Sequence, residues 1–195
     1  MEKRKKEVEY VEQCIERLIL LFQDDIYRFC LRLTGNQQDA EELFQETFMK
    51  AIQLKHRLLC ADAKTTEEEQ ESYDRKNRNF LLGIATNLWK NEHRKKVRRR
   101  KYVLQDGGEE TLAFVPSAQE VDQLVVQKEM ERDLLQLVYA LPEKLNLVIC
   151  MYYTANMKIE EIAKALHIPK GTVNSRLHLA KKRLRMEMEA KGYEI

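Results

Sequence analysis

The sequence predicts an all-α protein of two helical domains joined by a flexible acidic linker, the second being a helix-turn-helix four-helix domain. The chain has 195 residues, of which only 6 are glycine and 3 proline, while 44% are apolar and 34% charged. This composition favours amphipathic helices over strands. Apolar residues also recur at helical spacing, and no convincing strand alternation interrupts them. The predicted boundaries are residues 8–101, 102–119 and 120–190.

The N-terminal domain begins with a predicted helix over residues 8–33, which ends at Gly35. Asn36 is a good N-cap for the next helix, and Asp39 three residues later completes a variant of the capping box. That second helix is expected to run to about Leu54. Its apolar residues face a core, and its polar residues form the opposite face.

The rest of the first domain divides into an insert and a long basic helix. Residues 59–78 lose apolar periodicity and become acidic and polar, so we expect a long loop or a partly disordered insert there. Helix returns over residues 79–101. We expect Trp89 and Phe80, within this helix, to pack in the core. Paired glycines and acidic residues then mark the linker.

The second domain is predicted to contain helices over residues 120–140, 143–154, 158–166 and 170–189. Pro142 stands at the start of the second of these, a position that proline tolerates well. The last two helices have the spacing of a helix-turn-helix, in which the second helix enters the DNA major groove.

Three features of that pair support the motif. Ala163 is small where the two helices must cross, Ile168 fills the turn, and His167 stands where a positive φ is often needed. On a helical wheel, polar side chains that can read bases or neutralise phosphates lie opposite the apolar stripe of the second helix. They are Asn174, Ser175, His178, Lys181 and Lys182. An ordinary helical hairpin with a basic outer face is the alternative.

Charge is strongly segregated along the chain. Residues 75–101 carry eleven bases and one acid, and residues 158–185 carry eight bases and two acids. Residues 62–74 hold six acids and one lysine, and residues 105–122 hold five acids and no base. Two basic blocks separated by an acidic stretch predict two contacts with a polyanion, and nucleic acid fits best.

Composition also limits the cellular compartment and the kinds of chemistry that we expect for this protein. The four cysteines are scattered without a Cys-x-x-Cys pair, which indicates reduced thiols in a cytoplasmic protein. The apolar runs are too short for a membrane span or a signal-peptide core. The histidines are too dispersed for a metal-ligand set, so we expect no metal, no cofactor and no catalytic residues.

Three ordered motifs resemble those of bacterial sigma factors, and the nearest group is the extracytoplasmic-function (ECF) sigma factors. Residues 141–184 resemble the family's promoter-binding C-terminal domain. Residues 39–48, Asp-Ala-Glu-Glu-Leu-Phe-Gln-Glu-Thr-Phe, resemble the segment that docks on core RNA polymerase. Residues 80–87 followed by Arg94-Lys-Lys resemble the segment that reads and opens the promoter's minus-ten element. The resemblance implies a non-enzymatic subunit that directs transcription initiation at a stress- or envelope-responsive regulon.

The resemblance and the helical wheels together give three sets of site residues. Those expected to contact the minus-thirty-five element are Thr172, Asn174, Ser175, Arg176, His178, Lys181 and Lys182. Those expected to contact the minus-ten element are Asn87, Lys90, Asn91, Arg94 and Lys95. Those expected to dock on core polymerase are Asp39, Glu42, Gln45, Glu46 and Met49. The implied partners are the clamp helices and flap of core polymerase, promoter DNA and an anti-sigma factor, with no membrane insertion of the chain's own.

The sequence departs from the family pattern at four places. The stretch 59–78 is longer and more acidic than the family's usual short loop, which carries the pocket for a flipped minus-ten base. Phe80 stands where tryptophan is common, Leu179 where arginine is frequent, and His167 where glycine is common in the turn. Two other classes remain open: an independent DNA-binding regulator, and a nuclease whose clustered acids hold Mg²⁺.

Overall fold

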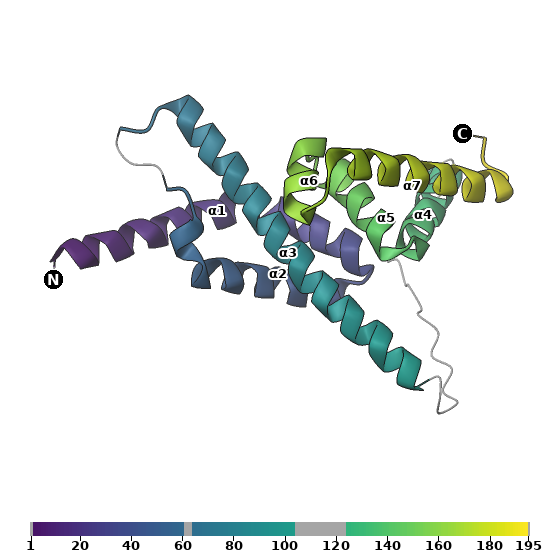
Figure 1. Cartoon of the computed structure of the whole chain (residues 1–195), viewed down its shortest axis with the longest axis horizontal. Coiled ribbons are helices and arrows are strands. Elements are labelled where there is room, and N and C mark those ends of the chain that lie inside the picture. The colour runs from purple at the N-terminus through teal and green to yellow at the C-terminus, as the bar shows by residue number, and fades with distance from the viewer. Residues whose placement is uncertain (1, 61–63, 104–123, 195) are drawn as a thin grey trace.

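The computed structural model describes residues 2–60, 64–103 and 124–194, and every regular element in this part of the chain is helical. The elements are α1 (Glu2–Thr34), α2 (Gln37–Gln53), η1 (Lys55–Arg57), α3 (Glu67–Val103), α4 (Leu124–Ala140), α5 (Glu143–Ile149), η3 (Cys150–Thr154), α6 (Ile159–Leu166) and α7 (Lys170–Ala190). Figure 1 shows α3 running diagonally across the molecule, with α4 to α7 gathered toward one end. The predicted all-α class is confirmed. Most of the predicted linker lies outside the described residues.

The α1–α2 hairpin forms as its local sequence predicts. Gly35 adopts a φ of 79°, a left-handed conformation that glycine reaches without strain, and it ends α1. Asn36 then caps α2, since its side-chain oxygen accepts a hydrogen bond from the Asp39 backbone N–H at 2.8 Å. On its inner face α2 buries Leu43 and Phe48.

The predicted loop over residues 59–78 is wrong for most of its length, because α3 already begins at Glu67. Thr66 and Glu69 form a reciprocal capping box there: the Glu69 carboxylate accepts from the Thr66 N–H at 3.0 Å, and the Thr66 hydroxyl accepts from the Glu69 N–H at 3.3 Å. Asn77 ties the preceding segment to the helix through two hydrogen bonds to the Leu59 backbone, at 2.9 and 2.7 Å. Residues 67–78 are therefore the opening turns of a long helix.

The C-terminal helices follow the predicted pattern with one local change. The helix predicted over residues 143–154 is α-helical only to Ile149 and then widens into the π-helical turn η3. Asn156, just beyond it, has a φ of 49°. Between α6 and α7, His167 adopts a φ of 53°, which confirms the left-handed turn expected at that position.

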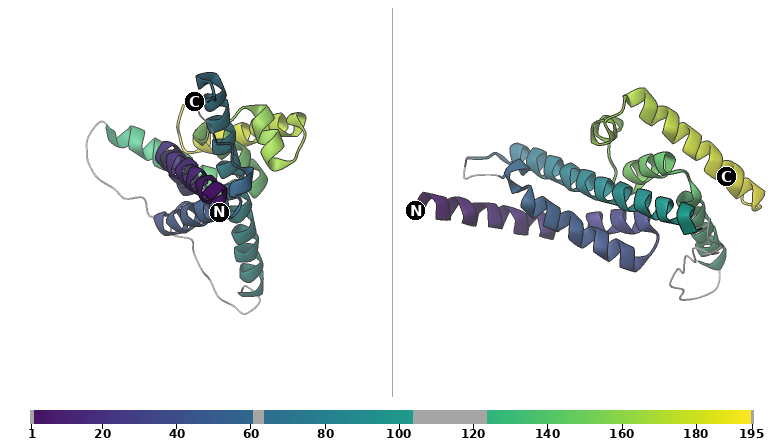
Figure 2. Two further views of the ribbon diagram at one scale, coloured as in Figure 1. Left: turned by 90° about the vertical axis from the view of Figure 1, so that its left-hand side faces the viewer. Right: turned by 60° about the horizontal axis from the view of Figure 1, so that its bottom comes forward.

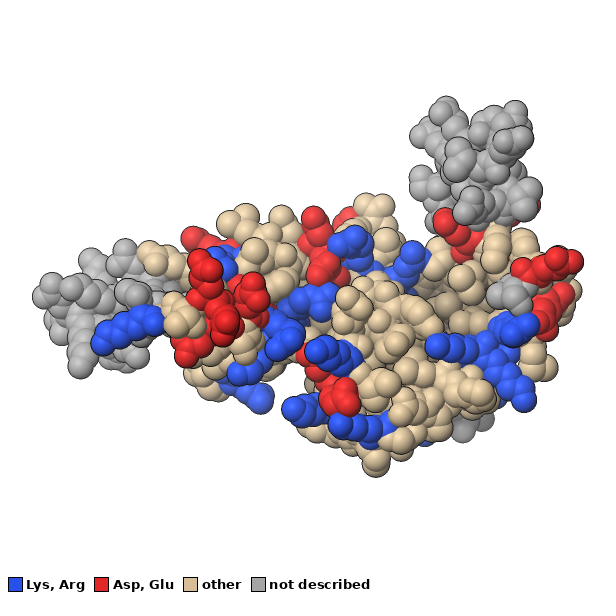
Figure 3. Space-filling model, turned by 90° about the horizontal axis from the view of Figure 1, so that it is seen from above, with Lys and Arg blue, Asp and Glu red and all other residues tan. Residues whose placement is uncertain are grey.

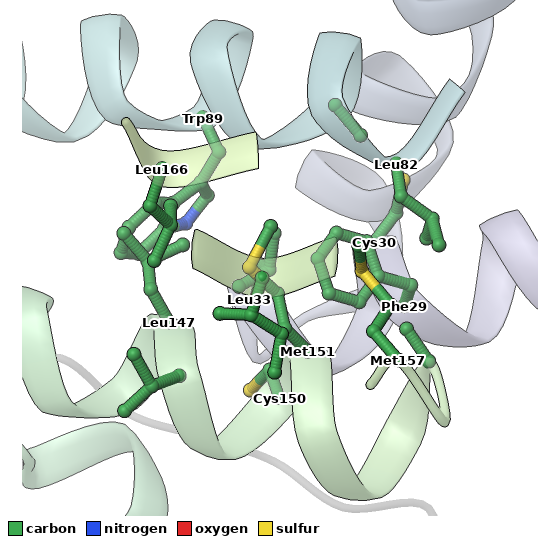
Figure 4. Packing of buried hydrophobic residues seen from close by; sticks show 14 of the residues in the cluster. Phe29, Cys30, Leu33, Leu82, Trp89, Leu147, Cys150, Met151, Met157 and Leu166 are labelled. Carbon is green, nitrogen blue, oxygen red and sulfur yellow. The ribbon is translucent and has the colours of Figure 1, made fainter. Parts of the chain in front are cut away.

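The two halves of the chain share one apolar core. Phe29 and Leu33 of α1, Trp89 of α3, and Leu147 and Met151 from the C-terminal half belong to the same buried cluster, and Figure 4 shows these side chains converging. Both views of Figure 2 place the C-terminal helices beside α3 rather than apart from it. Burial of apolar surface therefore holds the N-terminal and C-terminal helices together as well as folding each group.

Candidate nucleic-acid and docking interfaces

The helix-turn-helix is formed by α6, the turn at His167 and α7. Inside it, Ile162 of α6 packs with Val173 of α7, and both are fully buried. The N–H of Ile168 closes the turn on the Ala163 carbonyl at 3.0 Å. Because the inward face of α7 is fixed in this way, its opposite face presents side chains to solvent at a defined angle.

The structure brings the predicted minus-thirty-five residues together along that outer face. Five of them are exposed: Asn174, Ser175, His178, Lys181 and Lys182. Thr172 and Arg176 are half-buried at its edge. The Ser175 hydroxyl donates to the Thr172 carbonyl at 3.1 Å, which leaves its lone pairs free to accept from a base. Side chains of this kind at the exposed face of a helix fit major-groove readout.

Two tyrosines beside α7 were missed by sequence reasoning. The Lys181 ammonium lies 5.4 Å from the ring centroid of Tyr153 and 5.8 Å from that of Tyr152. A hydrogen bond with Tyr153 raises the pKa of Lys181, so the lysine keeps its charge. Tyr153 is 58% exposed. The signal in the sequence that could have pointed to these residues is the pair of tyrosines shortly before the helix-turn-helix. The Lys181 ammonium therefore has aromatic partners inside the chain.

The middle of α3 separates its inward and outward residues as predicted. Leu81, Ala85 and Trp89 are buried, and the indole of Trp89 stacks on His93 with ring centroids 4.8 Å apart. The expected core role of Trp89 is confirmed. Phe80 is partly buried against the same core, with the Arg57 guanidinium 5.3 Å from its ring centroid.

The predicted minus-ten residues share the outward face of α3, but several have partners within the chain. Asn87, Asn91, Arg94 and Lys95 are exposed, and Lys90 is half-buried. Lys95 pairs with Glu92 at 2.6 Å, and Arg94 reaches Glu143 of α5 at 4.0 Å.

Lys90 is the residue of this set whose ionisation is most affected by its surroundings. Burial lowers its pKa, and the positive charges of Arg94 and Arg176 act in the same direction, while Glu143 opposes them. The influence of Arg176 is informative because that residue belongs to α7. The two predicted DNA-contacting faces therefore lie within electrostatic reach of each other.

The outer face of α2 carries the predicted docking residues. Glu42, Gln45, Glu46 and Met49 are exposed, and 62% of the Met49 surface is accessible. An exposed methionine within a row of carboxylates suits a partner surface that is basic and partly apolar. Met49 is the apolar member of this otherwise polar set.

Asp39 differs from the other docking candidates because it is engaged inside the chain. Its carboxylate pairs with Lys96 at 2.6 Å and accepts from the Asn36 amide at 2.9 Å. Burial opposes ionisation, but the hydrogen bonds from Lys96 and Asn36 outweigh that effect and lower the pKa of Asp39. The residue thus links the start of α2 to α3, and its availability to a partner depends on breaking the Lys96 pair.

A groove separates this face from α4 and α5. It has a volume of about 890 Å³, and its lining includes Asp39, Glu42 and Glu46 of α2, Trp89 of α3 and Tyr139 of α4. Viewed from above, the molecule presents basic side chains spread over the middle of the surface, with acidic side chains in separate groups (Figure 3).

All four cysteines are free thiols. Within the described ranges, no group of three or more His, Cys, Asp or Glu side chains is placed to hold a metal ion.

Comparison with known proteins identifies the family. The family model described as Sigma-70 region 2 matches residues 18–59, and the one described as Sigma-70, region 4 matches residues 131–184. The ECF RNA polymerase sigma factor SigL of Mycobacterium tuberculosis is 30% identical over 168 residues, which cover 86% of this chain and 84% of SigL. The chain belongs to the ECF family of RNA polymerase sigma factors.

Other relatives of this ECF sigma factor extend the comparison over the whole chain. SigW of Bacillus subtilis is 28% identical over 193 residues, 96% of each chain. In a solved structure, the sigma factor RpoE from Bartonella quintana in complex with the anti-sigma factor NepR, a chain matches with a TM-score of 0.58 and 21% identity, covering 90% of this chain and 96% of that one. The match to the RpoE chain supports the all-α fold.

The family assignment fixes the general function. An ECF sigma factor is a DNA-binding transcription initiation factor that directs RNA polymerase to promoters, and the predicted recognition of this family is confirmed. The region 2 match contains α2, and the region 4 match contains the helix-turn-helix, whereas α3 lies beyond both matched segments. No helix among the described residues is both long enough and apolar enough to cross a bilayer.

Proposed function

We propose that this ECF sigma factor works as two promoter-reading domains attached to core polymerase through α2. In this proposal residues 120–190 read the minus-thirty-five element through α7, and residues 8–101 read and open the minus-ten element through α3, with residues 102–119 as the linker. The observation that carries the proposal is the exposed stripe of Asn174, Ser175, His178 and Lys182 on a helix whose inner face is fully packed.

The minus-ten role of α3 is supported by the chemistry of its outward face. Asn87 and Asn91 carry short exposed amides that can hydrogen-bond to base edges, and Arg94 begins a basic run that suits phosphates. Extruding a base from the duplex costs a few kcal/mol. A basic face that binds the displaced strand offsets that cost. Since Trp89 is buried, base stacking on this tryptophan is not part of the proposal.

Docking on polymerase is assigned to the acidic face of α2. Glu42, Gln45, Glu46 and Met49 would meet the clamp helices, where carboxylates opposite basic residues steer association and fix register. Asp39 would join them after releasing Lys96. The flap of polymerase would contact the C-terminal domain.

The remaining assignments follow from the family. The chain acts in the cytoplasm without catalysis of its own, and its regulon responds to stress or to the cell envelope. An anti-sigma factor controls it, as the NepR complex of the related RpoE suggests.

The deciding experiment is run-off transcription with purified core polymerase, with and without this protein, on a library of genomic fragments. Discrete transcripts that require both proteins are expected. The control is the variant Glu42→Lys/Glu46→Lys, which should lose the transcripts while retaining DNA binding by the C-terminal domain. DNA binding without any effect on core polymerase would instead favour the independent regulator, and Mg²⁺-dependent cleavage of the template would favour the nuclease.

A further inference from the structure

Two of the four free thiols lie in contact with each other. Cys14 belongs to α1, and Cys60 stands in the segment that follows η1. A hydrogen bond joins their side chains, and the Cys14 thiol also approaches the Leu59 carbonyl at 3.9 Å. Both cysteines are partly exposed. Because a disulfide forms only between side chains that already lie close together, this pair has the arrangement that an intramolecular disulfide requires.

The backbone around the pair is held on both sides. The Asn77 side chain of α3 accepts from the Leu59 N–H at 2.9 Å and donates to the Leu59 carbonyl at 2.7 Å. Arg17 of α1 pairs with Asp74 of α3 at 2.9 Å. These contacts fix the segment that carries Cys60 against α1 and α3. Two reactive groups held in this way react with each other faster than with groups of a second molecule.

The other two cysteines stand in a different environment. Cys30 is fully buried and Cys150 is 1% exposed, and both belong to the apolar core. Burial raises the pKa of each thiol to about 12. Because the thiolate is the nucleophile, a buried thiol that keeps its proton reacts slowly with a polar oxidant. Oxidation should therefore select the Cys14–Cys60 pair.

Within the pair, Cys14 is the residue that keeps its proton. Burial and the hydrogen bond with Cys60 raise the pKa of Cys14 to about 12; the charge of Asp74 acts in the same direction and that of Arg17 opposes it. Cys60 is therefore the better first nucleophile, and Cys14 is placed to supply a proton and then react with it. A cavity of about 190 Å³ lies beside Cys14 and has room for a molecule little larger than water.

We propose that Cys14 and Cys60 form a reversible disulfide when the protein meets hydrogen peroxide. The Cys60 sulfur attacks one peroxide oxygen, the O–O bond breaks, and the second oxygen leaves as water with the Cys60 proton, so that Cys60 becomes a sulfenic acid. The Cys14 sulfur then attacks the Cys60 sulfur, and the sulfenic hydroxyl leaves as water with the Cys14 proton. Two electrons pass from the two sulfurs to the peroxide, which yields two waters. A dithiol reverses the reaction by exchange.

The disulfide would change how firmly α1 is attached to its neighbours. It would join α1 covalently to the segment that Asn77 already ties to α3. A cross-link that closes a long loop also restricts the unfolded chain, so the oxidised protein should be the more stable form. This inference concerns the chain alone and does not depend on which DNA element each helix reads.

The test uses the full-length wild-type protein, reduced, treated with hydrogen peroxide and then digested without reductant. Mass spectrometry should find the peptide of Cys14 linked to that of Cys60. Thiol titration in denaturant should count two free thiols in place of four. Dithiothreitol should restore all four. The melting temperature of the oxidised protein should exceed that of the reduced protein by about 5 °C or more.

A matched pair of variants tests the order of the two steps. Cys14→Ser should lose one thiol to peroxide, as a sulfenic acid at Cys60 that dimedone traps. Cys60→Ser should keep its three thiols under the same conditions. Circular dichroism checks that both variants keep their helices. A sulfenic acid trapped at Cys14 in Cys60→Ser would overturn the assigned order.

The wild-type experiment decides the proposal even if a variant does not fold. Four thiols remaining after peroxide treatment would overturn it, as would disulfides that involve Cys30 or Cys150 or that join two chains. Equal melting temperatures of the oxidised and reduced forms would overturn the stabilising effect of the cross-link. Each of these results leaves the promoter roles of α3 and α7 untouched, because none of the measurements involves DNA or polymerase.

Discussion

The outer faces of α7 and α3 carry similar side chains but stand in different surroundings. On α7, Asn174, His178 and Lys182 are exposed on a helix packed within its own domain. On α3, Lys90 is half-buried, Lys95 pairs with Glu92, and Arg94 contacts α5. If both faces bind DNA as proposed, these three residues of α7 can do so as they stand, whereas Arg94 and Lys95 of α3 would first give up contacts made inside the chain.

This difference suggests a division of labour between the two helices. A preorganised face gains affinity because little has to be rearranged on binding. A face with internal partners binds more weakly until those partners are released. We therefore expect α7 to supply sequence-specific affinity in the free domain, and α3 to act once polymerase holds the chain on DNA.

The largest expected effect concerns α2, the helix proposed to dock on polymerase and so to bring α3 to the minus-ten element. Glu42→Lys/Glu46→Lys places positive charge against a basic partner, which costs several kcal/mol of association, equivalent to about a hundredfold or more in affinity. Both side chains are exposed, so thermal unfolding should change by no more than about 0.5 kcal/mol. Co-purification with core polymerase is the measurement. The control is Glu16→Lys/Glu71→Lys, which makes the same charge change at exposed positions of α1 and α3.

Next in size is a change that removes the support of the α7 face. Leu177 is 6% exposed on the inner side of α7, so Leu177→Ala should destabilise the protein by about 2–5 kcal/mol. Asn174→Ala, on the outer side of the same helix, should leave unfolding within about 0.5 kcal/mol of the wild type. Denaturant titration of both variants checks the pair. Equal stability of the two would mean that the inward and outward faces of α7 are wrongly assigned.

Smaller effects separate base reading from phosphate contact on α7. Ser175→Ala should weaken binding to the preferred sequence by about 1–3 kcal/mol and relax discrimination there. Lys182→Ala should weaken binding to all sequences about equally and reduce the salt dependence. Binding to the preferred duplex and to single-base variants, at two salt concentrations, is the measurement. A uniform loss in both variants would show that Ser175 does not read a base.

The smallest effect concerns the pair that ties α2 to α3. The pKa of Asp39 is lowered, so its ion pair with Lys96 stabilises the fold fully above pH 3.8, and this contribution is lost as pH falls below that value. The pair is partly exposed, so Asp39→Asn should cost only about 0.5 kcal/mol at neutral pH. Unfolding measured at pH 7 and near pH 3 tests this. The difference between the wild type and the variant should shrink at the lower pH, and a difference that grows would contradict the assignment.

Local patterns predicted most of the fold. The Asn36 cap, the turn at His167 and the apolar stripe of α7 each depend on a few neighbouring residues, so spacing and side-chain chemistry were enough. The loop predicted over residues 59–78 is wrong because a polar, acidic composition is equally compatible with the exposed first turns of a helix. The Thr66–Glu69 capping box stood in the sequence and marks the true start of α3.

From the sequence, the candidate site could be predicted only one helix face at a time. A helical wheel shows which side of one helix is polar, and the exposure of the outer face of α7 agrees with it. It does not show that Lys90 lies near Arg176, or that Arg78 bonds to a carbonyl 77 residues away. Such contacts depend on how helices distant in sequence pack, and the periodicity of one helix carries no information about them.

The most direct test of the account is a hydroxyl-radical footprint of the complex of polymerase, this protein and promoter, on a template taken from the run-off transcription. Protection of both the minus-ten and minus-thirty-five elements on one DNA molecule is expected, and it should require core polymerase and this protein together. Ser175→Ala should weaken the upstream protection, and Asn91→Ala the downstream protection. Protection of a single site that persists without polymerase would contradict the account.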